Sequence, residues 1–85
     1  MNKLKKLILD HINSIGCRPR TATDRHTIGK IEGIIEVMYM LDIIKESFTC
    51  DVLRRACRDI TNNETLSSVQ SATNTILDFC NMEND

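Results

Sequence analysis

The residues best suited to chemistry lie between Cys17 and Gly33, in the stretch CRPRTATDRHTIGKIEG. Arginines beside the N-terminus of a helix can hold a phosphate group or an acidic side chain. The stretch carries three arginines and a lysine just before and within the start of a predicted helix. We therefore take Arg18, Arg20, Arg25 and Lys30 as candidate partner-binding residues.

Three kinds of acidic group could meet these basic residues: acids of the same chain, an acidic protein surface, or nucleic acid. Residues 1–30 hold seven Lys and Arg against two acids, whereas residues 61–85 hold none against four. Such segregation can steer a charged partner, or it can draw the two ends of the chain together. The net charge of −1 and the lack of aromatic residues interleaved with the basic ones argue against nucleic acid. Three further lysines, Lys3, Lys5 and Lys6, could extend the basic surface.

A second basic cluster, formed by Arg54, Arg55 and Arg58, lies on one face of a short predicted helix. This helix follows the preceding one through a tight turn, so a helix-turn-helix that binds nucleic acid is the alternative interpretation. However, Asp51 and Asp59 each stand four residues from Arg55, a spacing typical of local ion pairs. The sequence therefore favours a salt-bridged outer face over a recognition helix.

Catalysis and metal binding are not expected. Cys50 and Cys57 are seven residues apart, about 10 Å along one helix, and one zinc ion cannot reach two sulfurs at that separation. Cys17, His26 and the nearby Asp24 could form a nucleophile–base pair, but no oxyanion site accompanies them. We expect no cofactor, no enzymatic activity, and four mostly buried, reduced thiols: Cys17, Cys50, Cys57 and Cys80.

The spacing of apolar residues predicts an all-α fold, a small bundle of four helices. The first helix runs from Lys3 to Ile15, with a half-buried His11 and Gly16 as its C-terminal cap. The second begins at Thr21 or Thr23 and ends at Lys45 or Glu46. The third spans 50–60 behind a Thr49 cap, and the fourth runs to Asn81 behind a capping box of Thr61 and Glu64. Residues 1–82 form one domain, and residues 83–85 form a frayed acidic tail.

The second helix carries apolar side chains around almost its whole circumference between Ile28 and Ile44. A helix of this kind is buried on nearly all sides, so we place it at the centre of the bundle. Three small amphipathic helices do not cover it completely, which favours a homodimer over a monomeric bundle. Gly29 and Gly33 share one face, where they permit close helix contact within the chain or across the dimer.

These patterns indicate a small interaction protein that acts by binding a protein partner. Adaptors, regulatory subunits and compact inhibitors, including those that viruses deploy, fit the description. A nucleic-acid-binding regulator is the alternative. No apolar run is long and uncharged enough to span a membrane or to serve as a signal peptide, so we expect a cytoplasmic protein.

Overall fold

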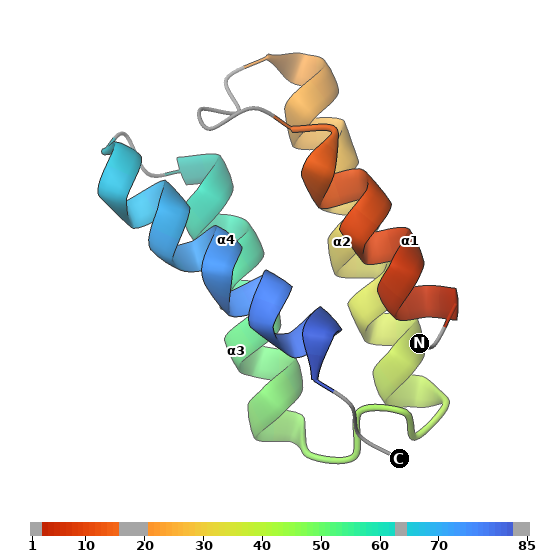
Figure 1. Cartoon of the computed structure of the whole chain (residues 1–85). Coiled ribbons are helices and arrows are strands. Elements are labelled where there is room, and N and C mark those ends of the chain that lie inside the picture. The colour runs from red at the N-terminus through yellow and green to blue at the C-terminus, as the bar shows by residue number, and fades with distance from the viewer. Residues whose placement is uncertain (1–2, 16–20, 63–64, 83–85) are drawn as a thin grey trace.

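The protein is an all-α bundle of four helices that run alternately up and down (Figure 1). The computed structural model describes residues 3–15, 21–62 and 65–82. The helices are α1 (Lys3–Asn13), α2 (Ala22–Met40), α3 (Ser47–Asn62) and α4 (Leu66–Asn81). The predicted fold class is confirmed. The predicted acidic tail, 83–85, and the predicted cap Gly16 lie outside the described residues.

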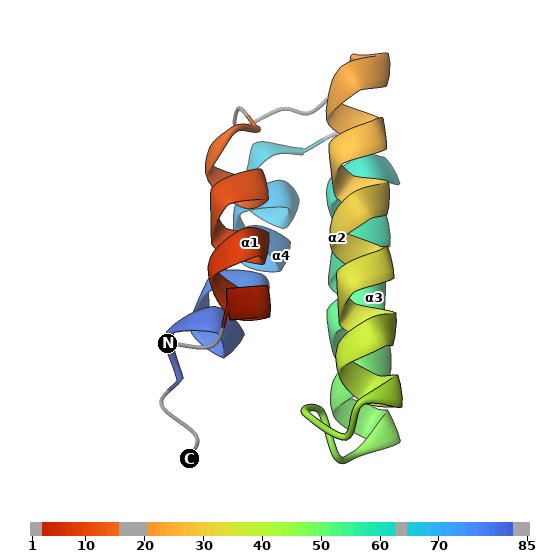
Figure 2. The ribbon, with the colours of Figure 1, turned by 90° about the vertical axis from the view of Figure 1, so that its right-hand side faces the viewer.

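The helices form a closed ring in which each helix packs against two neighbours. Helix α2 contacts α1 and α3, and α4 contacts α3 and α1. Figure 2 shows the two layers, with α1 and α4 in one and α2 and α3 in the other. Helix α2 thus occupies a corner of the bundle. The prediction that it lies at the centre is wrong.

Each helix buries one stripe of apolar side chains, at the spacing expected for an amphipathic helix. Isoleucine dominates the core, and three cysteines contribute to it. The core residues are Ile8, Ile12, Ile28, Ile31, Ile35, Met38, Ile44, Cys50, Leu53, Ala56, Cys57, Ile60, Val69, Ala72, Ile76 and Cys80.

The opposite face of α2 is open, which contradicts the prediction that this helix is buried nearly all round. Met40 is 78% exposed and Val37 is 43% exposed. The physical reason is geometric: a helix at a corner of the ring has neighbours on two sides only, and these cover a single stripe. Of the remaining large apolar side chains of α2, Ile34 packs partly buried against the core, and Val37, Tyr39 and Met40 stay on the surface.

Helix α2 ends several residues earlier than predicted because of a Schellman motif. The N–H of Ile43 donates to the carbonyl of Met38 at 2.9 Å, and that of Asp42 donates to Tyr39 at 3.2 Å. Asp42 occupies the left-handed position, with φ of 61°. Glycine is the usual residue at this position, so an aspartate there gave no signal of a helix end.

The boundaries of α3 and α4 also differ from the prediction. The N–H of Cys50 donates to the carbonyl of Glu46, so Thr49 lies inside α3 and does not cap it. Thr61 lies in the last turn of α3 and donates to the carbonyl of Cys57. Thr65 caps α4 by accepting from the N–H of Ser68. Thr61 therefore does not form the predicted capping box.

Two local predictions at the other end of the bundle are confirmed. Thr21 caps α2, and its hydroxyl accepts from the N–H of Asp24 at 3.0 Å. His11 is half-buried on α1, where its carbonyl accepts hydrogen bonds from both the N–H and the hydroxyl of Ser14.

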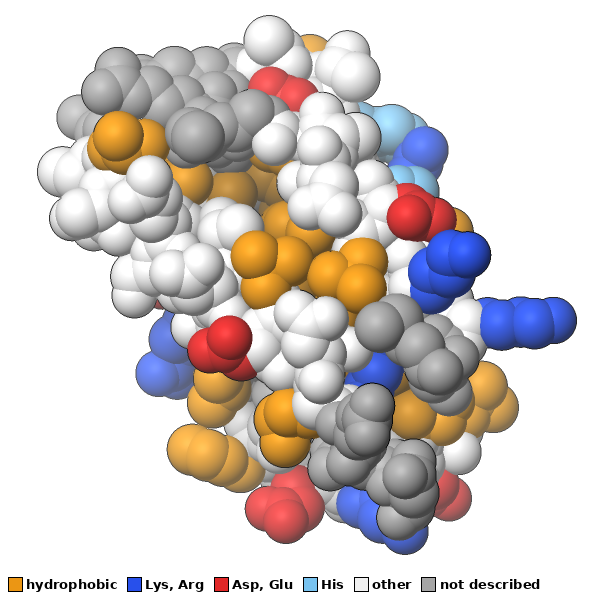
Figure 3. Space-filling model, viewed as in Figure 1, with side chains coloured by type: hydrophobic (Ala, Val, Ile, Leu, Met, Phe, Trp, Pro, Cys, Tyr) orange, Lys and Arg blue, Asp and Glu red, His pale blue; other side chains and the backbone are white. Residues whose placement is uncertain are grey.

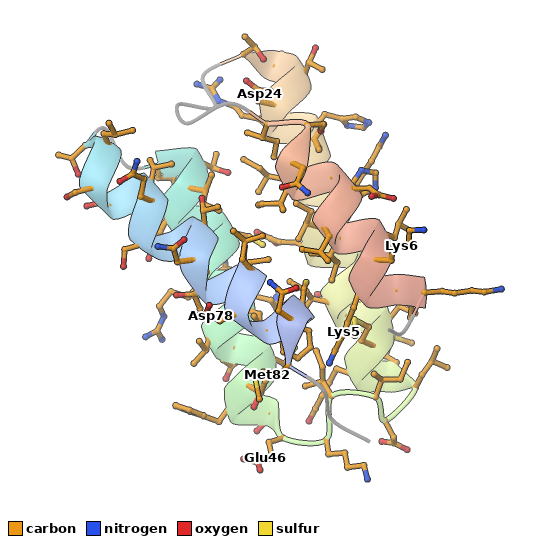
Figure 4. All side chains as sticks on the ribbon, in the orientation of Figure 1. Lys5, Lys6, Asp24, Glu46, Asp78 and Met82 are labelled. Atoms are coloured by element: carbon orange, nitrogen blue, oxygen red, sulfur yellow. The ribbon has the colours of Figure 1, made fainter. Side chains whose placement is uncertain are left out.

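Lys5 fastens α1 to the end of α4. Its side chain is only 7% exposed, and Nζ donates to the carbonyl of Met82 at 3.0 Å. The same Nζ lies 4.9 Å from the centre of the Phe79 ring, within cation–π range. Figure 4 shows Lys5 directed from α1 toward the end of α4. Of the three lysines in α1, Lys3 and Lys6 are exposed, but Lys5 does not extend a basic surface.

Replacing Lys5 should therefore weaken the fold, and replacing its neighbour Lys6 should not. We expect Lys5→Ala to lower the free energy of unfolding by about 1–3 kcal/mol, because a charge-assisted hydrogen bond and a cation–π contact are lost. Lys6→Ala removes the same charge from an exposed site and should change stability by less than about 0.5 kcal/mol. Urea unfolding followed by circular dichroism measures both. Equal stabilities of the two variants would contradict this role of Lys5.

Candidate protein-interaction surface

Large apolar side chains are exposed at the end of the bundle that holds the α2–α3 connection and the end of α4. Phe48 is 72% exposed and Met82 is 52% exposed. Leu41 and Ile43 in the connection are exposed as well. Scattered single apolar residues are ordinary on a protein surface, but a contiguous group is typical of an interaction site.

A groove between α3 and α4 gathers several of these side chains. Its volume is about 490 Å³. We call it the α3–α4 groove and define it by its lining residues: Glu46, Phe48, Thr49, Val52, Leu53, Thr75, Asp78, Phe79 and Met82. Figure 3 shows apolar side chains over the lower ends of these two helices, with acidic groups beside them.

The position of the α3–α4 groove follows from where the helices begin and end. Because α3 begins at Ser47, Phe48 lies in its first turn, and Val52 follows four residues later on the same side. From the facing helix, Phe79 lies in the last turn of α4, and Met82 is the C-terminal cap of that helix. The contact with Lys5 holds the Phe79 ring in place.

The rim of the α3–α4 groove is acidic. Glu46 and Asp78 line it and are exposed, and in Figure 4 Met82 lies between them. A second hollow, of about 440 Å³, adjoins the groove and shares Glu46, Thr49 and Phe79 with it. That hollow adds one acid, Asp42, and one base, Lys45. This end of the molecule therefore combines apolar contact area with a negative rim.

A third hollow lies between α1 and α4, at the other end of the bundle. Its volume is about 450 Å³, and amides and a hydroxyl surround an apolar floor. Its lining residues are Ile12, Asn13, Ile15, Ile60, Val69, Gln70, Thr73 and Asn74. None of these residues is ionisable or an exposed large hydrophobic. The α3–α4 groove is thus the stronger candidate for a binding site.

Of the basic residues taken as candidates from the sequence, Arg25 and Lys30 are exposed on α2. Five residues along a helix correspond to a rotation of about 140°, so these two side chains point to different sides of α2. Arg18, Arg20 and Cys17 lie outside the described residues, and so the predicted basic site and the Cys17–His26 pair stay predictions. His26 itself is exposed on α2.

The second basic cluster is only partly free. Arg54 forms an ion pair with Glu36 of α2 at 3.3 Å, while its Nε atom is buried without a partner. Arg55 and Arg58 are exposed. This is the one ion pair among residues 3–15, 21–62 and 65–82, so the local pairs predicted for Arg55 do not form.

The geometry of α3 also differs from that of a helix-turn-helix. In that motif the two helices meet at a steep angle, which lets the second helix enter the major groove. Here α3 lies alongside α2 and runs back in the opposite direction (Figures 1 and 2). Helix α2 packs along the whole length of α3, so the three arginines lie on the side of a packed helix and not on one that projects into a groove of DNA.

Three cysteines, Cys50, Cys57 and Cys80, are free thiols buried in the core, as predicted from the sequence. Burial raises the pKa of Cys57 to about 12 and that of Cys80 to about 11. Burial also raises the pKa of Cys50, although the nearby Arg54 opposes the shift. The thiolate is the reactive form, so these thiols are chemically inert near neutral pH.

We expect a thiol reagent at pH 8 to modify these three residues only after unfolding. Stability should also fall as pH rises above about 9, where the unfolded thiols ionise while the folded thiols hold their protons, and should continue to fall toward pH 12. Chemical unfolding at several pH values measures this loss. The decline should be shallower in Cys57→Ala, and an equally steep decline in that variant would contradict the assignment.

Comparisons with protein families, with curated proteins and with solved structures found no match to this chain. Among the helices that the structure describes, none combines the length and the apolar character needed to cross a membrane. Nor do the described residues contain a group of three His, Cys, Asp or Glu side chains arranged to hold a metal ion.

The α3–α4 groove was not predicted, because Phe48 falls in the predicted turn before the third helix and Met82 lies at the edge of the predicted tail. One signal was present. Phe48, Val52 and Phe79 are large apolar residues in the segment 31–85, which holds four Lys and Arg against ten Asp and Glu. Phe48 and Val52 fall outside the stripe that α3 buries.

Proposed function

We propose that this protein is a non-catalytic interaction protein that binds a helical segment of another protein in the α3–α4 groove. The observation that carries the proposal is the pair of exposed apolar side chains, Phe48 and Met82, beside an apolar groove with an acidic rim. An adaptor, a regulatory subunit or an inhibitor, of cellular or viral origin, would act in this way.

The shape of the groove suggests the kind of partner. A trough between two helices suits an amphipathic helix, which lays its apolar face on the floor and its polar edges on the rim. Glu46 and Asp78 line the rim, and Asp42 lies in the adjoining hollow. Complementary charge raises the association rate and disfavours acidic partners. We therefore propose an amphipathic partner with Lys or Arg beside its apolar stripe.

The apolar residues supply most of the binding energy in this proposal. At protein interfaces a few central side chains dominate, and exposed rim charges contribute less. Phe48 carries the largest apolar area that the described residues offer to a partner in the groove. The acids then act mainly on the choice of partner, and apolar contact acts on affinity.

The test uses two designed helical peptides with the same apolar stripe, one flanked by Lys and one flanked by Glu. We expect the basic peptide to bind at least about tenfold more tightly at low salt, and the difference should shrink as salt screens the rim. Phe48→Ala should weaken binding of the basic peptide by about tenfold or more. Fluorescence anisotropy of the labelled peptides measures each affinity.

Leu66→Ala is the matched control, because Leu66 is an exposed apolar residue at the start of α4, away from the groove. It should bind like the unaltered protein. Charge reversal at Arg20 and Arg25 tests the basic candidates from the sequence. If that reversal abolished binding while Phe48→Ala left it intact, the partner would lie on the basic surface and the groove would lose its role.

Nucleic acid remains the alternative partner, and the exposure of Arg55 and Arg58 is the observation in its favour. Each phosphate that a protein neutralises steepens the dependence of log affinity on log salt by about 0.9 for duplex DNA. We expect no measurable binding of a duplex at low salt. A salt slope of several units, lost in the Arg55→Ala, Arg58→Ala double variant, would favour this alternative.

A homodimer belongs to the proposal as well. The exposed outer side of α2 supports it, because two-fold association is the most common way to cover such a face. The three free thiols among the described residues support a reducing compartment, so we propose that the protein works in the cytosol.

A further inference from the structure

One side of α2 points away from the rest of the bundle. Ala22, Gly29, Gly33 and Met40 lie along the middle of this side, at spacings of seven, four and seven residues. All four are exposed. We call this surface, together with the side chains that flank it, the α2 outer face. The flanking residues are Arg25 and Glu36 on one edge and His26 and Val37 on the other.

None of the residues that the structure describes covers the α2 outer face. A Cβ atom built on Gly29 or on Gly33 would meet no atom within 4 Å. The predicted close contact therefore does not occur within the described part of the chain. Glycine is costly inside a helix, and here no intrachain packing offsets that cost. The exposed Met40 and Val37 add apolar area to the same side.

We infer that the α2 outer face binds the α2 outer face of a second copy, with the two helices antiparallel. This inference rests on the proposed homodimer and adds its geometry. A two-fold axis level with Ile31 brings Gly29 of one copy opposite Gly33 of the other. The same axis brings the long side chain of Met40 over the small side chain of Ala22. Glycine thus faces glycine, and the largest side chain of the face lies over a small one, so the two surfaces fit together.

Charge complementarity favours this register. Arg25 lies six residues before Ile31, and Glu36 lies five residues after it. In the antiparallel dimer they fall on the same edge and within about 2 Å in height, so each Arg25 faces Glu36 of the other copy. About half of the Glu36 side chain is exposed and available, beside its ion pair with Arg54. On the other edge, His26 lies opposite Val37.

The parallel arrangement lacks this complementarity. In a parallel two-fold dimer only the residues along the middle of the face meet their own copies, and each edge faces the other edge of the second copy. Arg25 would then face His26 and Glu36 would face Val37, so the pairing of Arg25 with Glu36 is lost. Two Met40 side chains would also meet at one end while two Ala22 side chains left a gap at the other. The lost pairing of opposite charges and the mismatched sizes both oppose that dimer.

The expected dimer is weak. Helix α2 has 19 residues, which corresponds to a length of about 28 Å, and only one side of it takes part. Such an area is smaller than a standard protein–protein interface. We therefore expect a micromolar dissociation constant, and the first measurement is the solution mass by sedimentation at low and high micromolar protein.

Disulfide cross-linking then tests the geometry, in the full chain with Cys17→Ser. The Ala22→Cys variant, the Met40→Cys variant and an equal mixture of the two are each oxidised in separate reactions. In the antiparallel dimer residue 22 is level with residue 40 of the other copy, whereas two copies of residue 22 are about 27 Å apart. A disulfide needs Cα atoms within about 7 Å. The mixture should therefore cross-link, and each variant alone should not.

A large side chain placed in the middle of the α2 outer face gives a second test of the dimer. Gly33→Gln should weaken the dimer by about tenfold or more, yet it improves helix propensity, so the variant should fold at least as well as the original protein. Lys6→Gln is the matched control, because Lys6 is exposed on α1, away from the α2 outer face, and its replacement should leave the dimer unchanged.

The outcomes separate the two proposals. A monomer at high micromolar concentration would overturn the homodimer together with this inference. A dimer that cross-links in the separate variants would be parallel, and a dimer insensitive to Gly33→Gln would use another face. Either of these two results overturns the antiparallel α2 contact but leaves the homodimer standing.

Discussion

The structure depends on a constraint of the four-helix ring: each helix has two neighbours and can bury one stripe. Helices α1, α3 and α4 satisfy this constraint with little excess, because most of their apolar residues lie in the buried stripe or pack against it partly buried. Helix α2 carries more apolar side chains than one stripe can hold. Ile28, Ile31, Ile35 and Met38 fill the stripe, and Ile34 packs against it partly buried. The large apolar side chains that remain exposed on α2 are Val37, Tyr39 and Met40. The apolar surface of this protein follows from the constraint.

The end of α2 determines the second apolar region. The left-handed backbone at Asp42 reverses the chain, so that Ile44 returns to the core and α3 begins at Ser47. That starting point sets the register of α3. Cys50, Leu53 and Cys57 then face inward, and Phe48 faces outward beside α4. If α2 continued to Lys45, as its composition predicts, Phe48 would fall in a loop and the α3–α4 groove would lack its largest side chain.

The predictions from the sequence succeeded where a single local rule decides the outcome. The four helices and the Thr21 cap follow from apolar spacing and from cap chemistry, and both were predicted. The predictions failed at helix boundaries, where one residue can belong to either of two neighbouring segments. Asp42 stands where glycine is usual, and Thr61 could begin one helix or end another. The burial of Lys5 depends on Phe79 and Met82, more than seventy residues away, so no local pattern could reveal it. The α3–α4 groove combines both kinds of information, which explains why it was missed.

The two proposed surfaces are compatible with each other. The α2 outer face and the α3–α4 groove belong to different helices, and α2 and α4 occupy opposite corners of the ring. A second copy on α2 therefore leaves the groove open. An antiparallel two-fold also turns the second copy end over end, which places the two grooves at opposite ends of the dimer. Such a dimer would bind two helical segments at once, and a partner with two suitably spaced segments would gain affinity through the second, intramolecular contact. Weak self-association and weak single-site binding could in this way produce a strong complex.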